Sequence, residues 1–188
     1  MKVLVGCEES QVVTKAFRDK GHEAYSCDLV DTRGNPEWHI KDDVMNHLKG
    51  WDLIILHPDC TAMAVSGNRW YGEGMPYNNK RYEAEVWTIN LWVLACLHCE
   101  KVALENPVST IFSKIGSTQY IHPWQFGHGE TKKTGLALHG LPELKPTNTV
   151  EGREQRIWKM PPGPNRKRDR SKTYQGIADA MADQWGNL

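Results

Sequence analysis

The sequence predicts an α/β fold in which a mostly parallel, twisted sheet carries helices on both faces. Short apolar runs typical of buried strands occur at residues 2–5, 52–56 and 102–104. Stretches with helical spacing of apolar residues separate such runs, and this alternation is typical of βαβ units. Polar or acidic residues directly follow most of the runs, and ligands bind at that edge of a parallel sheet.

The first strand and helix follow from the beginning of the chain. Residues 2–5 are predicted as a strand because they are largely apolar and stop at Gly6. Ser10 occupies the expected N-cap position of a helix whose apolar spacing begins at Val12. Gly21 is expected to end that helix, since glycine readily adopts the left-handed conformation of a helix terminus.

The next elements repeat this alternation. Residues 23–27, 38–44 and 52–56 are expected to hold strands, and residues 67–79 a loop because they are rich in glycine and asparagine. The remaining elements are the clearest helix, two more strands and a final helix, expected at residues 82–97, 102–104, 136–138 and 177–185.

The composition is that of one globular domain spanning residues 1–188. With 39% apolar and 24% charged residues, it excludes a disordered, collagen-like or coiled-coil protein. The longest apolar run, residues 91–97, is too short to cross a membrane, and we expect no signal peptide at residues 1–6. Five irregularly spaced cysteines favour free thiols in a reducing compartment. We therefore expect a cytoplasmic protein that does not contact membranes.

The formal net charge of zero conceals a basic segment. Residues 153–172 contain eight Lys or Arg against two acidic residues, a balance of +6. Residues 161–164 include three prolines, which favour irregular structure. The segment is either a solvated loop or a loop that contacts phosphate groups.

Two acidic positions favour a cationic, nucleoside-bearing cofactor such as S-adenosylmethionine. Glu8, beside Glu9, follows the first strand where a phosphate would otherwise bind, and it would repel an anion. Asp28 ends the second strand, where an acidic residue accepts hydrogen bonds from ribose hydroxyls in dinucleotide folds. The alternative is an exposed acidic loop.

Two further strand ends carry reactive groups. Cys60 follows residues 52–56 and is either a nucleophile or a buried structural cysteine. The negative charge of Asp59 is expected to raise the pKa of the Cys60 thiol. Glu105 directly follows the apolar run at residues 102–104. It is either a general acid, with a pKa that is raised by burial, or a surface carboxylate. Trp70 is either a core residue or a platform for a base. Cys96-Leu97-His98-Cys99 lacks further ligands at suitable spacing, so we expect no metal site.

These motifs, in this order, resemble the C5-cytosine DNA methyltransferases, particularly their short phage- and prophage-type members. The resemblance covers nearly the whole chain. Its most specific parts are Pro58-Asp59-Cys60-Thr61 and Leu104-Glu105-Asn106-Pro107, whose Cys and Glu lie 45 positions apart. The other similar segments are residues 3–10, 26–28, 42–44, 126–134 and 170–178 together with Ser66.

The resemblance implies a Rossmann-like, S-adenosylmethionine-dependent methyltransferase that acts on duplex or single-stranded DNA. Cys60 would add to C6 of a flipped-out cytosine, while Glu105 would hold or protonate N3, and the methyl group would go to C5. Lys132 is the cation nearest to the position of the arginine in the family's motif.

The resemblance also implies binding residues. Those for the cofactor are Gly6, Cys7, Glu8, Ser10, Asp28, Asp43, Val44, Pro58, Ser171 and Thr173. Those for the nucleic acid are Ser66, Trp70, Arg166, Lys167, Arg168 and Arg170.

Three departures from the family pattern leave other functions open. Asp59 replaces the usual proline before the cysteine, and Thr134 stands where the family has a base-contacting arginine. Residues 145–170, a short basic and Pro-rich segment, replace a target-recognition domain. The alternatives are a catalytically weak DNA- or cofactor-binding decoy or regulator, and a methyltransferase acting on free cytosine nucleotide or RNA. A specificity partner or a homodimer is also compatible with the missing domain.

Overall fold

The computed structural model describes residues 1–116, 119–164 and 166–188, except the side chains of Trp158, Lys167 and Arg168. Within them lies a seven-stranded sheet of order β3-β2-β1-β4-β5-β7-β6. The strands are β1 (Lys2–Gly6), β2 (Glu23–Asp28), β3 (His39–Lys41), β4 (Leu53–Leu56), β5 (Val102–Pro107), β6 (Gln119–Ile121) and β7 (Thr134–His139). β1 to β5 pair in parallel, whereas β7 is antiparallel to both β5 and β6. The predicted mostly parallel α/β sheet is confirmed.

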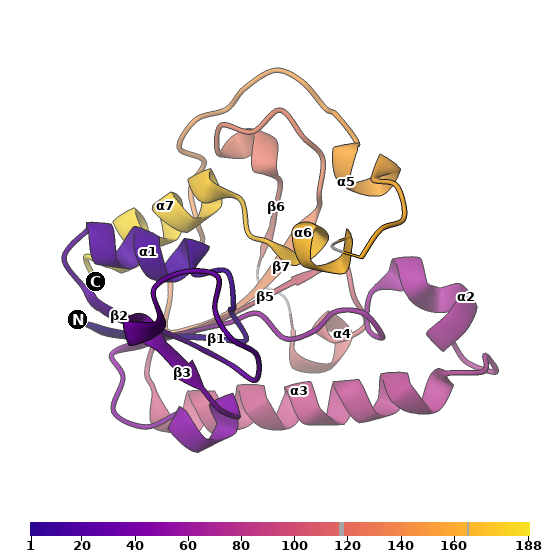
Figure 1. Ribbon diagram of the computed structural model, residues 1–188, viewed down its shortest axis with the longest axis horizontal. Helices are drawn as coiled ribbons and strands as arrows, with labels where there is room; N and C mark the ends of the chain where they lie inside the picture. Colours follow the sequence, from indigo (N-terminus) through magenta and orange to yellow (C-terminus); the bar gives the residue numbers. More distant parts are fainter. Residues whose placement is uncertain (117–118, 165) are drawn as a thin grey trace.

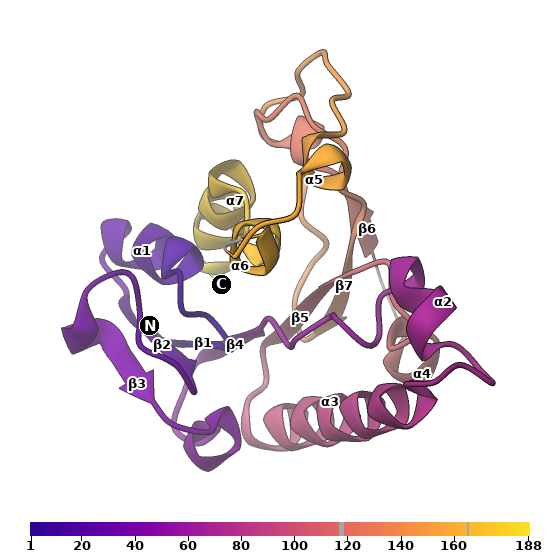
Figure 2. The same ribbon diagram turned by 45° about the vertical axis from the view of Figure 1, so that its right-hand side comes forward.

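Helices cover both faces of the sheet, as predicted (Figures 1 and 2). On one face, α1 (Val12–Asp19) and α7 (Gln175–Trp185) form a core with Val3 and Val5 of β1. On the other face, α3 (Asn78–His98) and α4 (Phe112–Ile115) form a second core that includes Leu4. Because both faces are covered, β1 and β4 are apolar at consecutive positions rather than alternately.

The remaining helical elements are short. They are α2 (Asn68–Tyr71), α5 (Arg156–Lys159), α6 (Arg166–Ser171) and the 3₁₀ turns η1 (Pro36–Trp38), η2 (Val44–His47), η3 (Val65–Gly67) and η4 (Pro123–Gln125). The expectation of loop throughout residues 67–79 is therefore wrong at α2. The basic segment likewise contains α5 and α6, separated by residues 161–164, which are irregular as their prolines predict. β6 and α4, three and four residues long, were not predicted.

No helix among the described residues is both long enough and apolar enough to cross a membrane.

Candidate active site

The carboxyl ends of β1, β2, β4 and β5 meet at one edge of the sheet, and the candidate catalytic and cofactor residues of these strands lie at or just after these ends. Gly6 permits a close approach there. A Cβ on Gly6 would lie 2.6 Å from Cγ2 of Val44 and 2.9 Å from Cδ2 of Leu56. A larger residue at position 6 would push away the turn that follows β3. Gly6 therefore lets the loops after β1 and β3 pack together.

The helix start beside Gly6 is capped by Glu8 rather than by Ser10. The Glu8 carboxylate accepts hydrogen bonds from the backbone N–H of Val13 at 2.8 Å and of Thr14 at 3.2 Å, and from the Thr14 hydroxyl at 2.7 Å. The prediction of a Ser10 N-cap is wrong, because Gln11 occupies the cap position and makes no side-chain cap. Glu8 is 5% exposed, and its carboxylate neutralises the positive end of α1. Its contact with the cofactor stays a prediction beside this structural role.

Gln11 is a structural residue that the sequence analysis missed. Its φ of 56° lies in the left-handed region, which is uncommon for a residue other than glycine. Its fully buried side-chain amide donates to Ser26 Oγ at 3.0 Å and accepts from the backbone N–H of Asn35 at 2.7 Å. These bonds hold the loops after β1 and β2 together beside the candidate cofactor site.

Acidic side chains surround the loop after β1. Burial raises the pKa of the Cys7 thiol, and the negative charges of Asp28, Asp43 and Asp59 raise it further. Burial also raises the pKa of Asp28, although that carboxylate accepts a backbone hydrogen bond from Val30. The potential at this edge of the sheet is therefore negative, which favours a cationic ligand over a phosphate.

The loop carrying Cys60 is held from two sides. The Asn106 side chain of β5 donates to the Pro58 carbonyl at 2.9 Å. Arg81 of α3 donates to the carbonyls of Ala62 at 2.7 Å and Ala64 at 3.3 Å. The loop after β4 is thereby fixed to its neighbouring strand and to the helix below it. The pattern of α3 gave no indication that Arg81 faces inward.

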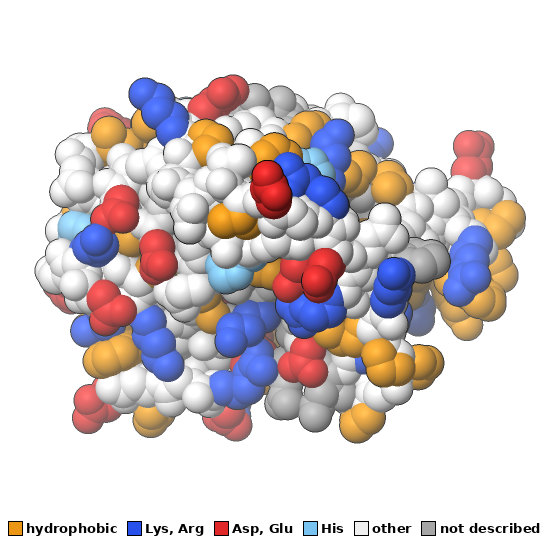
Figure 3. All heavy atoms as spheres, turned by 90° about the horizontal axis from the view of Figure 1, so that it is seen from above, with side chains coloured by type: hydrophobic (Ala, Val, Ile, Leu, Met, Phe, Trp, Pro, Cys, Tyr) orange, Lys and Arg blue, Asp and Glu red, His pale blue; other side chains and the backbone are white. Residues whose placement is uncertain are grey.

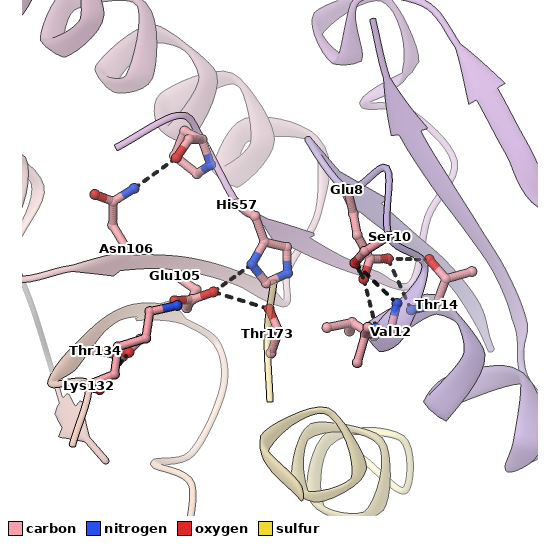
Figure 4. Close-up of polar contacts among 12 residues, drawn as sticks. Glu8, Ser10, Val12, Thr14, His57, Glu105, Asn106, Lys132, Thr134 and Thr173 are labelled. Carbon is pink, nitrogen blue, oxygen red and sulfur yellow. Dashed lines mark hydrogen bonds and ion pairs between the residues drawn. The ribbon is translucent and has the colours of Figure 1, made fainter. Parts of the chain in front are cut away.

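Glu105 is joined by a residue that the sequence analysis did not single out. His57 Nδ1 lies 2.8 Å from Glu105 Oε2, and the Thr173 hydroxyl donates to the same oxygen at 3.4 Å (Figure 4). The two side chains of the His57–Glu105 pair are only 11% and 9% exposed. His57 Nε2 is buried and has no hydrogen-bond partner among the described residues. Thr173 was assigned to the cofactor, but its hydroxyl contacts the catalytic candidate.

This pair reverses the predicted electrostatics of Glu105. Burial raises the pKa of Glu105, but the hydrogen bond and positive charge of His57, and the charge of Lys132, lower it below its usual value. Burial lowers the pKa of His57, but the hydrogen bond and charge of Glu105 and the charge of Glu8 raise it overall. The predicted rise in the pKa of Glu105 is wrong because the sequence did not reveal this cation. The pair is a carboxylate and an imidazolium that share one proton.

Lys132 acts on both reactive groups. Figure 4 shows its side chain reaching toward Glu105, and its amine donates to the Arg170 carbonyl at 3.1 Å. Burial and the charge of Asp59 raise the pKa of Cys60, whereas the positive charge of Lys132 lowers it. The predicted effect of Asp59 is confirmed. Thr134 is 2% exposed, and its hydroxyl donates to the Lys132 backbone, so it makes no contact equivalent to an arginine's.

The other cofactor candidates differ in their exposure and in the hydrogen bonds that they already make. Val44 is 4% exposed and packs against Gly6, so its side chain belongs to the core. Pro58 is buried, and its carbonyl accepts the Asn106 bond. Ser171 is exposed at the end of α6. Asp43 caps η2 by accepting from the Met45 N–H at 3.0 Å.

The nucleic-acid candidates lie on the surface around this edge. Trp70 of α2 is 50% exposed, with the Arg69 guanidinium 5.5 Å from its ring centre, and Ser66 is exposed in η3. Figure 3 shows hydrophobic side chains on the projection at its right-hand side, where Figure 1 places α2. Arg166 donates to the Met160 carbonyl at 2.9 Å, and Arg170 is half-buried. The side chains of Lys167 and Arg168 lie outside the described set.

Two segments of the resemblance contact each other directly. Tyr174 donates a 2.5 Å hydrogen bond to Glu130, and the Gly176 N–H donates to His128 Nε2 at 3.0 Å. These contacts bring the end of the chain over β5, and Thr173 reaches Glu105 as a result.

Comparisons with known proteins leave the residues themselves as the basis for assigning a function. No protein-family model matches the sequence, and no curated protein is detectably similar to it. Among the described residues, no group of three or more His, Cys, Asp or Glu side chains is arranged to hold a metal ion.

Proposed function

We propose that this chain transfers a methyl group from S-adenosylmethionine to C5 of cytosine in DNA through a covalent bond to Cys60. The observation that carries the proposal is that the Cys60 thiol follows β4, that the Glu105 carboxylate lies in the carboxyl-terminal half of the neighbouring strand β5, and that Lys132 influences the pKa of both. A nucleophile, a proton-holding group and a cation in one place are the set that addition to a pyrimidine ring requires.

The sheet supports the methyltransferase assignment. Its mostly parallel order, with a reversed β7 between β5 and β6, is compatible with the Rossmann-like methyltransferase fold that the resemblance implies. Fold alone does not define an activity, so the assignment depends on the residues at the sheet edge.

The residues at that edge fit the cofactor. S-adenosylmethionine supplies an electrophilic methyl group on a positively charged sulfonium. Asp28 would accept hydrogen bonds from the ribose hydroxyls, and the Gly6–Cys7 turn would line the cofactor site. The negative potential from Asp28, Asp43 and Asp59 favours the sulfonium charge. The loop after β1 is closed by the Glu8 cap and does not offer the free amides of a phosphate site.

Cys60 begins the reaction as a thiolate. Its sulfur forms a bond to C6 of the cytosine, and the C5=C6 electron pair moves through the ring toward N3. Lys132 favours the thiolate, whereas burial and Asp59 oppose it. Addition at C6 makes C5 nucleophilic toward the methyl group. The C5 proton then passes to a solvent water, and its bonding pair restores the C5=C6 double bond and expels the Cys60 thiolate.

Glu105 and His57 manage the proton at N3. Glu105 Oε2 accepts the Nδ1 proton of His57 in the resting site. As negative charge develops at N3, protonated His57 gives its Nδ1 proton to Glu105, and the carboxylic acid so formed donates a proton to N3, which leaves His57 neutral. When Cys60 leaves, the proton returns along the same path. His57 therefore acts through Glu105 and is a positioning residue.

DNA as the substrate is supported by the surface around the site. Exposed Trp70, together with Arg166 and Arg170 of α6, flanks the edge that carries Cys60. A base inside a duplex must leave the stack to reach a buried thiol, at a cost of a few kcal/mol. Aromatic stacking and phosphate contacts offset part of that cost without reading sequence.

Trapping on DNA that contains 5-fluorocytosine tests this proposal. Fluorine at C5 cannot leave as a proton would, so the enzyme should remain bonded to the base after methyl transfer. We expect a cofactor-dependent, denaturation-resistant protein–DNA adduct whose tryptic peptide carries the modification on Cys60. Cys60→Ala should give no adduct, while Cys96→Ala, which changes another partly buried thiol, should give the wild-type amount. A Cys60 that remains unmodified while the cofactor binds would contradict the proposal.

The raised pKa of Cys60 favours one second candidate, a binding protein on the same fold that acts as a decoy or regulator. This candidate predicts cofactor or DNA binding without turnover, even at high pH. Adduct formation that appears only in Asp59→Asn would favour it over the enzyme.

A further inference from the structure

The face of α3 that points away from the sheet carries large hydrophobic side chains that are exposed and lie outside the two cores. Along this helix the inward residues include Arg81, Glu85 and Thr88, which are buried. The outward residues include six large hydrophobic side chains with exposures between 37% and 71%: Tyr82, Val86, Trp87, Val93, Leu94 and Leu97. Figures 1 and 2 show α3 along the lower edge of the molecule, with the sheet on one side of it. A helix that is apolar on the side away from its own sheet is typical of an interface.

The order of residues on this face is self-complementary. Asn90 is exposed at its centre, opposite the inward Thr88. A two-fold axis through Asn90 places position 86 against 94 of a second copy, and position 87 against 93. Val86 then meets Leu94, and Trp87 meets Val93. An interface in which each patch contacts its own copy is the arrangement that two-fold symmetry produces.

The same axis places a protruding side chain opposite a hollow. Tyr82, 69% exposed, stands eight residues before Asn90 and so faces His98, eight residues after it. His98 and Leu94 line a groove of about 270 Å³ between α3 and η2, which is also lined by Met45, Asn46, Leu48 and Lys49. Tyr82 of one copy therefore projects toward the groove of the other, and the arrangement is reciprocal between two copies of this chain.

The area also suits a dimer. At roughly 100–250 Å² for a complete apolar side chain, the six exposed residues present on the order of 500 Å² of apolar surface. Asn90, Glu83 and the groove residues bring each copy near the roughly 800 Å² per partner that a stable interface buries. We propose that two copies of this chain pair through antiparallel α3 helices, with Tyr82 of each inserted beside His98 of the other.

The oligomeric state of the full chain tests this directly. Sedimentation or light scattering should give about 43 kDa, twice the chain mass of 21.4 kDa. Tyr82→Glu and Leu94→Glu should each shift the mass to that of one chain while circular dichroism remains unchanged. Tyr120→Glu, which alters an exposed tyrosine of β6, should leave the dimer intact. A wild-type chain that stays monomeric at high micromolar concentration would overturn the proposal.

Two further variants test the geometry and the identity of the occupant. Asn90→Cys should form a disulfide-linked dimer under mild oxidation, because the axis brings both copies of position 90 together, whereas Glu83→Cys should not. Failure of the Asn90→Cys link in a persistent dimer would refute this arrangement.

Discussion

Replacing His57 is expected to destabilise the protein strongly, because it leaves the Glu105 carboxylate buried with reduced compensation. The pair is joined at 2.8 Å, and its side chains are only 11% and 9% exposed. Removing one partner of such a pair costs about 3–5 kcal/mol. Since Lys132 still faces Glu105, we expect His57→Ala to cost about 3 kcal/mol. His57→Asn should cost less, because its amide is able to donate to the same oxygen.

The pH dependence has a defined sign. The pKa of His57 is raised from its usual value of 6.5, so its contribution is complete below 6.5 and disappears as pH rises through the folded pKa. The pKa of Glu105 is lowered from 4.5, so its contribution is complete above 4.5 and disappears as pH falls through the folded pKa. The difference between wild type and His57→Ala should therefore be largest between about pH 4.5 and 6.5.

Urea unfolding at pH 5.5 and pH 8.5 measures this difference. His47→Ala is the matched control, because His47 also lies 2.8 Å from a carboxylate, Asp42, but the pair is exposed. We expect His47→Ala to shift the unfolding midpoint far less than His57→Ala. A His57→Ala penalty below about 1 kcal/mol, or one that grows from pH 5.5 to 8.5, would refute the reasoning.

Three other substitutions probe the site. Asp59→Asn should increase the alkylation rate of Cys60 at pH 8 by roughly three- to tenfold, since removal of a neighbouring negative charge lowers the thiol pKa. Peptide mass spectrometry measures the alkylation rate, and an unchanged rate would contradict this prediction. Glu8→Ala should cost about 1–2 kcal/mol by removing the cap of α1, whereas a neutral result in urea unfolding would show that the cap is dispensable. Asn106→Ala should cost about 1–3 kcal/mol, because the buried Pro58 carbonyl loses its donor, and wild-type stability would contradict this.

The sequence predicted the parts of the fold that depend on local pattern. The strands β1, β4 and β5 follow from short apolar runs, and the ends of β4 and β5 bring Cys60 and Glu105 to one edge of the sheet. The helix after Ser10 was expected, but its cap was not. Gln11 adopts a left-handed conformation at the cap position, and the Glu8 carboxylate caps the helix in place of Ser10.

The parts that failed depend on contacts between distant positions. His57 precedes a proline at a strand end, and nothing local indicates that its ring meets a carboxylate 48 positions away. Thr173 approaches the same oxygen from 68 positions away. The apolar spacing of α3 predicted a helix but not which side faces inward, because Arg81 and Glu85 are satisfied there by the Cys60 loop and by Thr110.

The central claim is that this chain methylates C5 of cytosine through a covalent bond between Cys60 and the base, and transfer of labelled methyl from S-adenosylmethionine tests it most directly. Duplex DNA, single-stranded DNA, RNA and dCMP are offered in parallel, with Cys60→Ala as the control. The account predicts label on C5 of cytosine in DNA that is absent from the variant. Label in RNA or dCMP alone would contradict DNA as the substrate, and no label anywhere despite cofactor binding would contradict the enzyme assignment.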